Sequence, residues 1–158
     1  MNGFSLWPFL VPVAGLAVLL LAWWMYRLGR EVQSERARES FRLQKERLEG
    51  EVLKAASASG KPRGLRWVSC RFTEGFTLVR DRATRRLAAL IPVTVVFDPV
   101  PGGDMEGVEA ATQPRQATAV LHFRHGEWVS DGRTLFNVSP SDALRLHQRE
   151  FDAVPPTA

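Results

Sequence analysis

The residues of this sequence that could do chemistry are few. His122, His125 and Glu127 lie close together in the sequence, and imidazole and carboxylate groups are common metal ligands. On a strand followed by a turn, however, His122 and His125 point to opposite faces, so they do not converge on one ion. A histidine on the surface or at the tip of a hairpin explains this cluster better than a metal centre.

Acidic residues gather in one loop. Residues 98–109 contain no basic residue and four acidic ones, namely Asp98, Asp104, Glu106 and Glu109. A calcium-binding loop needs acidic residues at alternate positions and a closing bidentate glutamate. Asp104 and Glu106 begin such a spacing and no later residue completes it, so no metal site is predicted here.

The single cysteine and the net charge narrow the classes of function further. Cys70 lies between Val68 and Phe72 at alternate positions, which favours a buried structural thiol over a nucleophile. The sequence has no glycine-rich phosphate loop and no nucleophile elbow. The 21 Lys and Arg residues exceed the 17 Asp and Glu residues too little to require a nucleic-acid partner. We predict no catalytic residue, no cofactor, no metal ion and no nucleic acid.

The first structural element that the sequence predicts is an apolar N-terminal segment. Residues 6–26 contain no charge, and as a helix they would span about 31 Å, close to the hydrocarbon thickness of a bilayer. Aromatic residues near both ends fit a membrane–water interface. Residues 1–26 are therefore predicted to be a transmembrane anchor, with the interfacial residues Trp7, Trp23, Trp24, Tyr26, Arg27 and Arg30.

Two other interpretations of the apolar segment are a buried core helix and a cleaved signal peptide. A core helix is rarely this long without a charge. A signal peptide would start with basic residues and end in small ones, whereas this segment starts without Lys or Arg and ends in Trp23-Trp24-Met25-Tyr26. Pro12 is expected to kink the helix or to mark its start.

The flanking charges predict the orientation. Basic residues close to a span stay on the cytoplasmic side. No Lys or Arg precedes this span, and seven follow it closely: Arg27, Arg30, Arg36, Arg38, Arg42, Lys45 and Arg47. We predict a single-pass protein of the inner membrane with the bilayer as a partner, its N-terminus outside and its C-terminal part in the cytoplasm.

Residues 27–58 are predicted to form a charged helical stalk. They contain no proline and carry one apolar stripe at helical spacing, made of Ala37, Phe41, Leu48, Val52 and Ala55. Phe41, Leu48 and Val52 would be the seam of a short coiled coil and give a homodimer. Because Gln44 and Lys45 interrupt the stripe, a solvated single helix, or one lying on the membrane, is the alternative. Residues 59–64, with two glycines and a proline, form a linker.

Residues 65–154 are predicted to form a small α+β domain, followed by a tail at 155–158. Alternating apolar residues between turn signals indicate an antiparallel meander of about five to six strands, at 65–72, 76–80, 87–97, 117–124, 127–130 and 133–137. Pro92 lacks an N–H, so a bulge or an edge is expected there. Ser139 should cap one C-terminal helix that covers the sheet with Leu144, His147 and Phe151 and hides Trp67, Trp128 and Phe136.

One hairpin of this domain is basic. Arg80, Arg82, Arg85 and Arg86 cluster there, and within the hairpin only Asp81 opposes them. Such a tip could contact lipid headgroups, an acidic partner, or the acidic loop of a neighbouring copy. An ordinary solvated turn is the alternative.

The layout as a whole predicts a membrane-anchored protein without enzymatic activity. Its stalk would present the small cytoplasmic domain for protein–protein interaction, as a scaffold or assembly component whose partner the sequence does not identify. The alternative is a membrane-tethered enzyme or a domain that binds a small ligand.

Overall fold

The computed structural model describes residues 7–60, 62–73 and 75–155, although the side chains of residues 7–14, 30 and 31 lie outside the described part. The chain divides after Arg36 into two compact units, which are described separately. Helix α1 (Trp7–Leu43) supplies the first unit and begins the second. The other elements, all in the second unit, are α2 (Lys45–Ala58), β1 (Leu65–Phe72), β2 (Thr77–Asp81), β3 (Leu87–Pro99), the 3-10 turn η1 (Glu109–Ala111), β4 (Arg115–Arg124), β5 (Glu127–Phe136), α3 (Pro140–Leu146) and β6 (Phe151–Ala153).

The predicted stalk is two helices rather than one. α1 ends at Leu43, and Gln44 leaves the helical conformation with φ −113° and ψ 12° before α2 starts. The backbone N–H of Gln44 still donates to Ser40 at 3.2 Å, so the interruption is short. The apolar stripe continues past it to Ala56, which is fully buried, instead of to Ala55 as expected from spacing alone.

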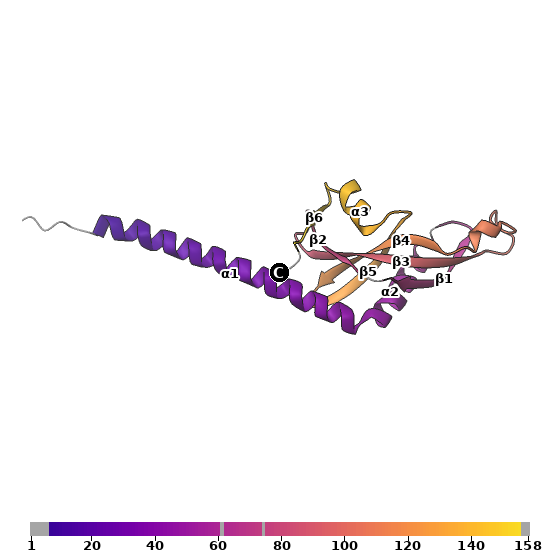
Figure 1. The fold of residues 1–158 in the computed structure, drawn as a ribbon, viewed down its shortest axis with the longest axis horizontal. Coiled ribbons are helices and arrows are strands. Elements are labelled where there is room, and N and C mark those ends of the chain that lie inside the picture. Colours follow the sequence, from indigo (N-terminus) through magenta and orange to yellow (C-terminus); the bar gives the residue numbers. More distant parts are fainter. Residues whose placement is uncertain (1–6, 61, 74, 156–158) are drawn as a thin grey trace, which may run out of the picture. The chain divides into compact units, whose positions relative to one another are not determined.

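The six strands form one antiparallel sheet (Figure 1). β3 is the central strand and has β4 along one whole side, with β5 beyond it. Along its other side, β1 pairs with the second half of β3 and β2 pairs with the first half. β6 then pairs with the outer side of β2. The segment before β2 therefore lies beside the middle of β3, whereas the segment after β2 lies at the end of the sheet where β3 begins.

Pro92 lies at the junction between β1 and β2 along β3. β1 ends opposite Val93 and β2 begins opposite Leu90, so neither strand pairs with Pro92 itself. Its carbonyl oxygen accepts hydrogen bonds from the N–H and the hydroxyl of Thr73, at 2.9 and 3.0 Å. Because the N–H and C=O of one strand residue point to the same side, the nitrogen of Pro92 also faces this junction. The missing N–H therefore removes no ladder bond, and β3 needs no bulge at this position.

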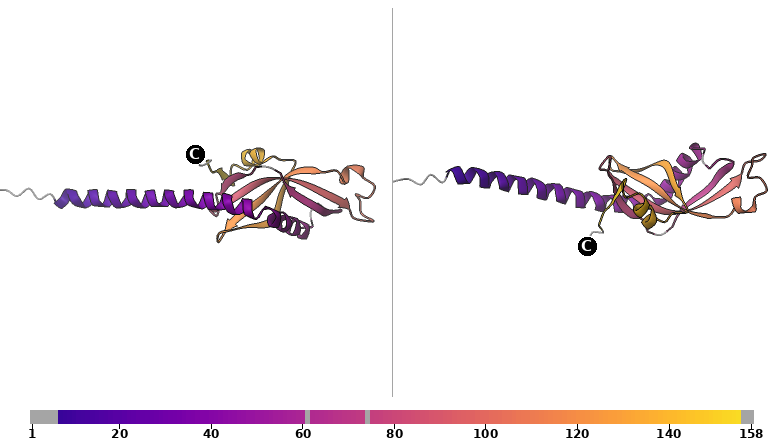
Figure 2. Two further views of the ribbon diagram at one scale, coloured as in Figure 1. Left: turned by 60° about the horizontal axis from the view of Figure 1, so that its bottom comes forward. Right: turned by 90° about the horizontal axis from the view of Figure 1, so that it is seen from above.

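Helices cover both faces of the sheet, as Figure 2 shows, with α2 on one side and α3 on the other. Alternate residues of β3 divide between the two layers. Ile91, Val93, Val95 and Phe97 join the larger core under α1 and α2. Ala88 and Leu90 join a smaller core with Ala143 of α3 and Phe151 of β6. The prediction that the C-terminal helix alone covers the sheet was wrong, because the apolar stripe of residues 37–56 covers the larger face.

β5 is one strand where the sequence predicted two strands and a turn at Asp131-Gly132. Ser130 pairs with Leu121 and Thr134 pairs with Ala119, so β5 has extra residues between these pairs and bulges. Gly132 lies in this bulge with φ +80°. Asp131-Gly132 therefore indicated a departure from regular strand conformation correctly, but this departure is a bulge within one strand instead of a turn between two.

The C-terminal segment also differs from its prediction. Ser139 caps α3 as expected, since its hydroxyl accepts a hydrogen bond from the N–H of Asp142 at 3.2 Å. The helix ends at Leu146, however, and Phe151 belongs to strand β6 instead of to the same helical face. Phe151 is still buried, because pairing with β2 turns its side chain into the smaller core. In outline, the predicted order of a long helix, a six-stranded antiparallel sheet and a C-terminal helix is confirmed.

Candidate functional site

The surface of α1 between Leu16 and Tyr26 is apolar around its whole circumference. Leu19, Leu20 and Leu21 are consecutive residues that point in different directions, and each is more than half exposed. The same holds for Trp23 and Trp24. A helix that is apolar on all sides is normally surrounded by other apolar material. This surface is the largest run of exposed apolar side chains in the described part of the chain.

The interfacial residues predicted near the end of this segment lie close together on α1. The guanidinium carbon of Arg27 is 5.8 Å from the ring centroid of Trp23, within cation–π distance. With Trp24 and Leu28 these residues line an open hollow on the helix surface. The side chains of Trp7 and Arg30 lie outside the described residues.

In the described part of the chain, whose side chains in α1 start at Gly15, no helix is both long enough and apolar enough to cross a membrane.

The three residues predicted as a dimer seam are core residues of this chain. Leu48 and Val52 are fully buried and Phe41 is 7% exposed, all against the chain's own sheet. The ring of Phe41 lies 5.8 Å from that of Phe72 and 4.4 Å from that of Phe76. The sheet thus occupies the surface that the sequence analysis assigned to a second copy. Self-association itself stays a prediction.

The basic hairpin has an acidic neighbour that its own sequence does not contain. Nε of Arg82 donates to a carboxylate oxygen of Asp152 in β6 at 2.7 Å, and Arg85 lies 3.9 Å from the same carboxylate. Arg80 donates to the backbone oxygen of Arg85 at 2.9 Å. Arg85, with φ +59°, and Arg86 are exposed. The four arginines are therefore together, as predicted, with Asp152 between two of them.

A half-buried ion pair fastens the C-terminal segment to the bulge of β5. Both terminal nitrogens of Arg133 donate to the carboxylate of Glu150, one of them at 2.9 Å. The guanidinium carbon of Arg133 also lies 5.7 Å from the ring centroid of Phe151. The hydrogen bonds from Arg133 hold the pKa of Glu150 below its ordinary value, so this carboxylate is charged at neutral pH. A bidentate pair of this kind fixes geometry as well as charge.

The two histidines considered as metal ligands lie on the β4–β5 hairpin, His122 in β4 and His125 at its turn. Nε2 of His122 lies 3.7 Å from a carboxylate oxygen of Asp131 on the neighbouring strand. His125 is at the tip of the β4–β5 hairpin with φ +53°. Glu127, the third residue considered, is exposed at the start of β5. No group of three or more His, Cys, Asp and Glu side chains is placed to hold a metal ion in the described ranges.

The acidic loop binds to itself and to its flanking strands. Asp98 forms an exposed ion pair with Arg66 at 3.4 Å. A carboxylate oxygen of Glu106 accepts a hydrogen bond from the N–H of Gly102 at 2.7 Å. Asp104 and Glu109 are exposed. The acidic loop is therefore folded and negatively charged.

Cys70 is buried at the β1 side of the larger core. Burial raises the pKa of its thiol to about 12, and the nearby carboxylate of Glu49 adds to the effect. That carboxylate is fixed, because it accepts a hydrogen bond from the N–H of Phe72 at 2.7 Å. A thiol with so high a pKa is not a nucleophile at neutral pH, because the thiolate is the reactive form.

The Cys70 thiol is therefore expected to resist modification by an aromatic disulfide at pH 8 in the folded chain and to react at once in denaturant. Since the pKa of the folded thiol exceeds the ordinary value of 9.0, the unfolded state alone ionises between pH 9 and about 12. The free energy of unfolding should accordingly fall as the pH rises through this range. Cys70→Ala, which has no thiol, should lose that part of the pH dependence. Rapid modification of the folded protein would contradict the buried position.

Three polar residues near the C-terminus were missed by the sequence analysis. Arg133, Glu150 and Asp152 stand on different strands or segments, and the sequence analysis gave them no role. A helix continued through residues 147–154 would have separated Asp152 from the basic hairpin. Only the pairing of β6 with β2 puts the two side by side.

Comparison of this chain with protein-family models, with curated proteins and with solved structures finds no match.

Proposed function

We propose that this protein is a single-pass membrane protein in which α1 anchors the chain and the α+β domain acts as an interaction module. The observation that carries the proposal is the apolar surface of α1, which is exposed on every side of the helix. In this proposal the domain is a scaffold or assembly component on the cytoplasmic side of the inner membrane, without enzymatic activity.

The cost of leaving this surface in water supports a lipid environment. Nine large side chains contribute to it, namely Leu16, Val18, Leu19, Leu20, Leu21, Trp23, Trp24, Met25 and Tyr26, and each is more than half exposed. Full burial of one such side chain is worth about 1.5–3 kcal/mol. Surrounding all nine with hydrocarbon would therefore contribute on the order of 10 kcal/mol even after the part already covered by the helix is subtracted.

The uncharged segment also extends toward the N-terminus in the sequence, before the described side chains of α1 begin. Residues 6–14 are also without charge, and together with residues 15–26 they reach the length that a bilayer requires. The arginines after the span favour the cytoplasm for the domain. These are arguments from sequence, and they support the proposal independently of the exposed helix surface.

The polar side chains of the domain support an interaction module more than an enzyme. The half-buried side chains of Arg133 and Glu150 pair with each other and hold the C-terminal segment to β5. Cys70 is protonated and covered. Nothing in the described part of the chain favours the alternative of a tethered enzyme or ligand-binding domain.

A homodimer remains part of the proposal, but not through the predicted seam while the domain is folded. Pairing through Phe41, Leu48 and Val52 would require α2 to leave the sheet, because these side chains fill the larger core. Self-association through the membrane segment has little sequence support, since the small residues of 6–26, Ala14, Gly15, Ala17 and Ala22, form no Gly-x-x-x-Gly pair.

The orientation is tested by reporters fused after Ala158. A green fluorescent protein should be fluorescent there, and an alkaline phosphatase should be inactive, because its disulfides do not form in a reducing cytoplasm. The chain should also stay with membranes after washing at alkaline pH. For comparison, replacing Arg27, Arg30 and Arg36 with glutamine should weaken the preference for this orientation, since these are the nearest three of the seven basic residues that favour it. An active phosphatase on the unaltered chain would overturn the orientation, and release by the alkaline wash would overturn the anchor.

A further inference from the structure

The chain enters the α+β domain next to the β4–β5 hairpin. Trp128, at the start of β5, donates a hydrogen bond from its indole N–H to the backbone oxygen of Ala37 at 2.8 Å. Ala37 is the first residue of the second unit. Trp128 pairs with Phe123, immediately before the turn at His125. The covalent connection to the anchor is therefore at this end of the sheet.

Two other segments reach the same end. The pairing of Ala88 with His122 places the β2–β3 hairpin beside the β4–β5 hairpin. The pairing of Asp81 with Phe151 brings the start of β6 alongside, and the N–H of Arg82 donates to the backbone oxygen of Glu150 at 2.8 Å. We call this end of the domain, formed by residues 80–86, 124–127 and 149–152, the entry end.

The entry end is rich in arginine. It contains four acidic residues, Asp81, Glu127, Glu150 and Asp152, and six arginines, Arg80, Arg82, Arg85, Arg86, Arg124 and Arg149. Three of the acids are already engaged in the domain, and one of these, Asp152, pairs with Arg82 and Arg85 of the entry end itself. Glu150 binds Arg133, and Asp81 accepts a hydrogen bond from the N–H of Thr84 at 2.7 Å. Arg86, Arg124 and Arg149 are exposed and come from three different segments.

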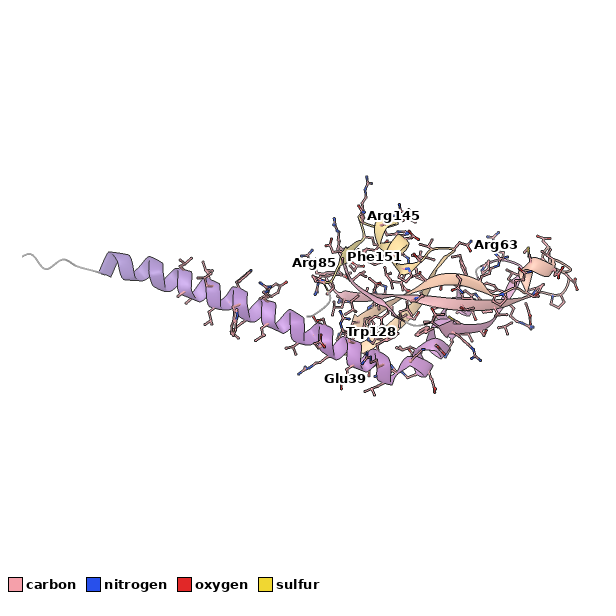
Figure 3. All side chains as sticks on the ribbon, viewed as in Figure 1. Glu39, Arg63, Arg85, Trp128, Arg145 and Phe151 are labelled. Carbon is pink, nitrogen blue, oxygen red and sulfur yellow. The ribbon has the colours of Figure 1, made fainter. Side chains whose placement is uncertain are left out.

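The other end of the domain carries the acidic loop beside the basic residues Arg63, Arg66 and Arg115. The acidic loop between β3 and β4 lies there, with the exposed residues Asp104, Glu106 and Glu109. Figure 3 shows Arg85 at the entry end and Arg63 toward the opposite one. The domain thus has an arginine-rich end at the connection to the anchor, and its one acidic loop lies away from that end.

We propose that the entry end of the domain docks on anionic lipid headgroups of the membrane that holds α1. The inference rests on the proposed anchor and adds a binding surface to it. Ten residues separate Tyr26 from Ala37, which is about 15 Å of helix. A connection this short lets the entry end reach the bilayer surface, where exposed charges interact within a Debye length of about 8–10 Å. An anionic surface attracts the arginines and repels the acidic loop, so it selects one orientation of the domain.

The expected strength follows from the three exposed arginines. Each basic residue near an anionic membrane strengthens association about fivefold. Reversing the charge of Arg86, Arg124 and Arg149 should therefore shift the equilibrium between docked and undocked domain by about 100-fold or more. High salt should weaken docking in the unaltered protein, because the contact is electrostatic.

The test measures energy transfer from an uncharged dye on the full-length protein to a headgroup dye in nanodiscs. Ala83→Cys places the donor at the entry end, and Gln113→Cys places it at the other end. Cys70 stays unlabelled because it is buried and protonated. Transfer from position 83 should be higher in nanodiscs containing about 30% phosphatidylglycerol than in pure phosphatidylcholine, and transfer from position 113 should not rise. The difference should disappear in 0.5 M NaCl.

The matched variants carry the same change of net charge. R86E/R124E/R149E should abolish the effect of the anionic lipid, whereas R63E/R71E/K54E, at exposed positions away from the entry end, should keep it. Equal transfer in the two lipids, or the same loss in both triple variants, would overturn docking. A third outcome is that R86E/R124E/R149E keeps the lipid dependence but no longer binds an acidic protein. This outcome would assign the surface to that protein and would also overturn docking on lipid. Failure of the chain to enter nanodiscs at all would instead contradict the anchor.

Discussion

Replacing Trp128 with alanine is expected to lower the free energy of unfolding of the domain by about 3–5 kcal/mol. Trp128 is fully buried, and its ring lies 5.1 Å from that of Phe123 and 6.2 Å from that of Phe41. Its indole N–H donates to the backbone oxygen of Ala37. The substitution removes the side chain that joins α1, β4 and β5, and it leaves a large cavity. Urea unfolding of the full-length chain in detergent, followed by near-ultraviolet circular dichroism, measures the change.

Two variants separate the causes. Trp128→Phe keeps an aromatic ring and removes the N–H, so it should cost less than Trp128→Ala. Trp24→Ala deletes an equally large side chain from an exposed position on α1 and should change the unfolding of the domain by less than about 0.5 kcal/mol. A loss below about 1 kcal/mol for Trp128→Ala would mean that Trp128 is not in the core.

Gly132→Ala is expected to destabilise the domain by about 3–5 kcal/mol, through steric clash together with backbone strain. A β-carbon at this position would lie 2.5 Å from the backbone carbon of Ala55 and 2.7 Å from the nitrogen of Ala56. These are backbone atoms of α2, so no side-chain rotation relieves the contact. The φ of +80° adds strain for any residue with a β-carbon. α2 must move away from β5, and the larger core must open.

Gly126→Ala is the matched control for this prediction. Gly126 has a similar φ of +88°, but a β-carbon there would meet no atom within 4 Å. It should therefore show only the backbone term, about 1–2 kcal/mol. The difference between the two variants measures how closely α2 approaches the sheet. Equal effects would show that α2 does not pack on Gly132.

Local signals in the sequence predicted most of the sheet. Leu65–Phe72 was predicted with the observed bounds, and β2, β3 and β4 were displaced by only a few residues. The Ser139 cap was also confirmed. These features depend on alternation, on turn residues and on side chains that bind their own backbone, all of which are visible over a few positions. The positions of the basic and acidic segments were equally visible.

The surface that covers the apolar stripe of residues 37–56 could not be predicted from such local signals. The spacing of Phe41, Leu48 and Val52 showed that one helix face must be covered, but a second copy and the chain's own sheet fit that pattern equally well. The tertiary structure decided in favour of the sheet, because β5 bulges at Gly132 and lets α2 approach. That contact depends on two segments about 75 positions apart in the sequence.

The sequence by itself determined the elements whose causes are local: the apolar N-terminal segment, the helical stripe, the strands with their turns, and the helix cap. Only the tertiary structure decided which surfaces these elements share. It showed that residues 37–58 belong to the domain core, that the C-terminal segment ends in a strand beside β2, and that three arginine-bearing segments meet where the chain enters the domain. The physical reason is that pairing and packing join residues distant in the chain, so their free energies depend on contacts that no short stretch of sequence contains.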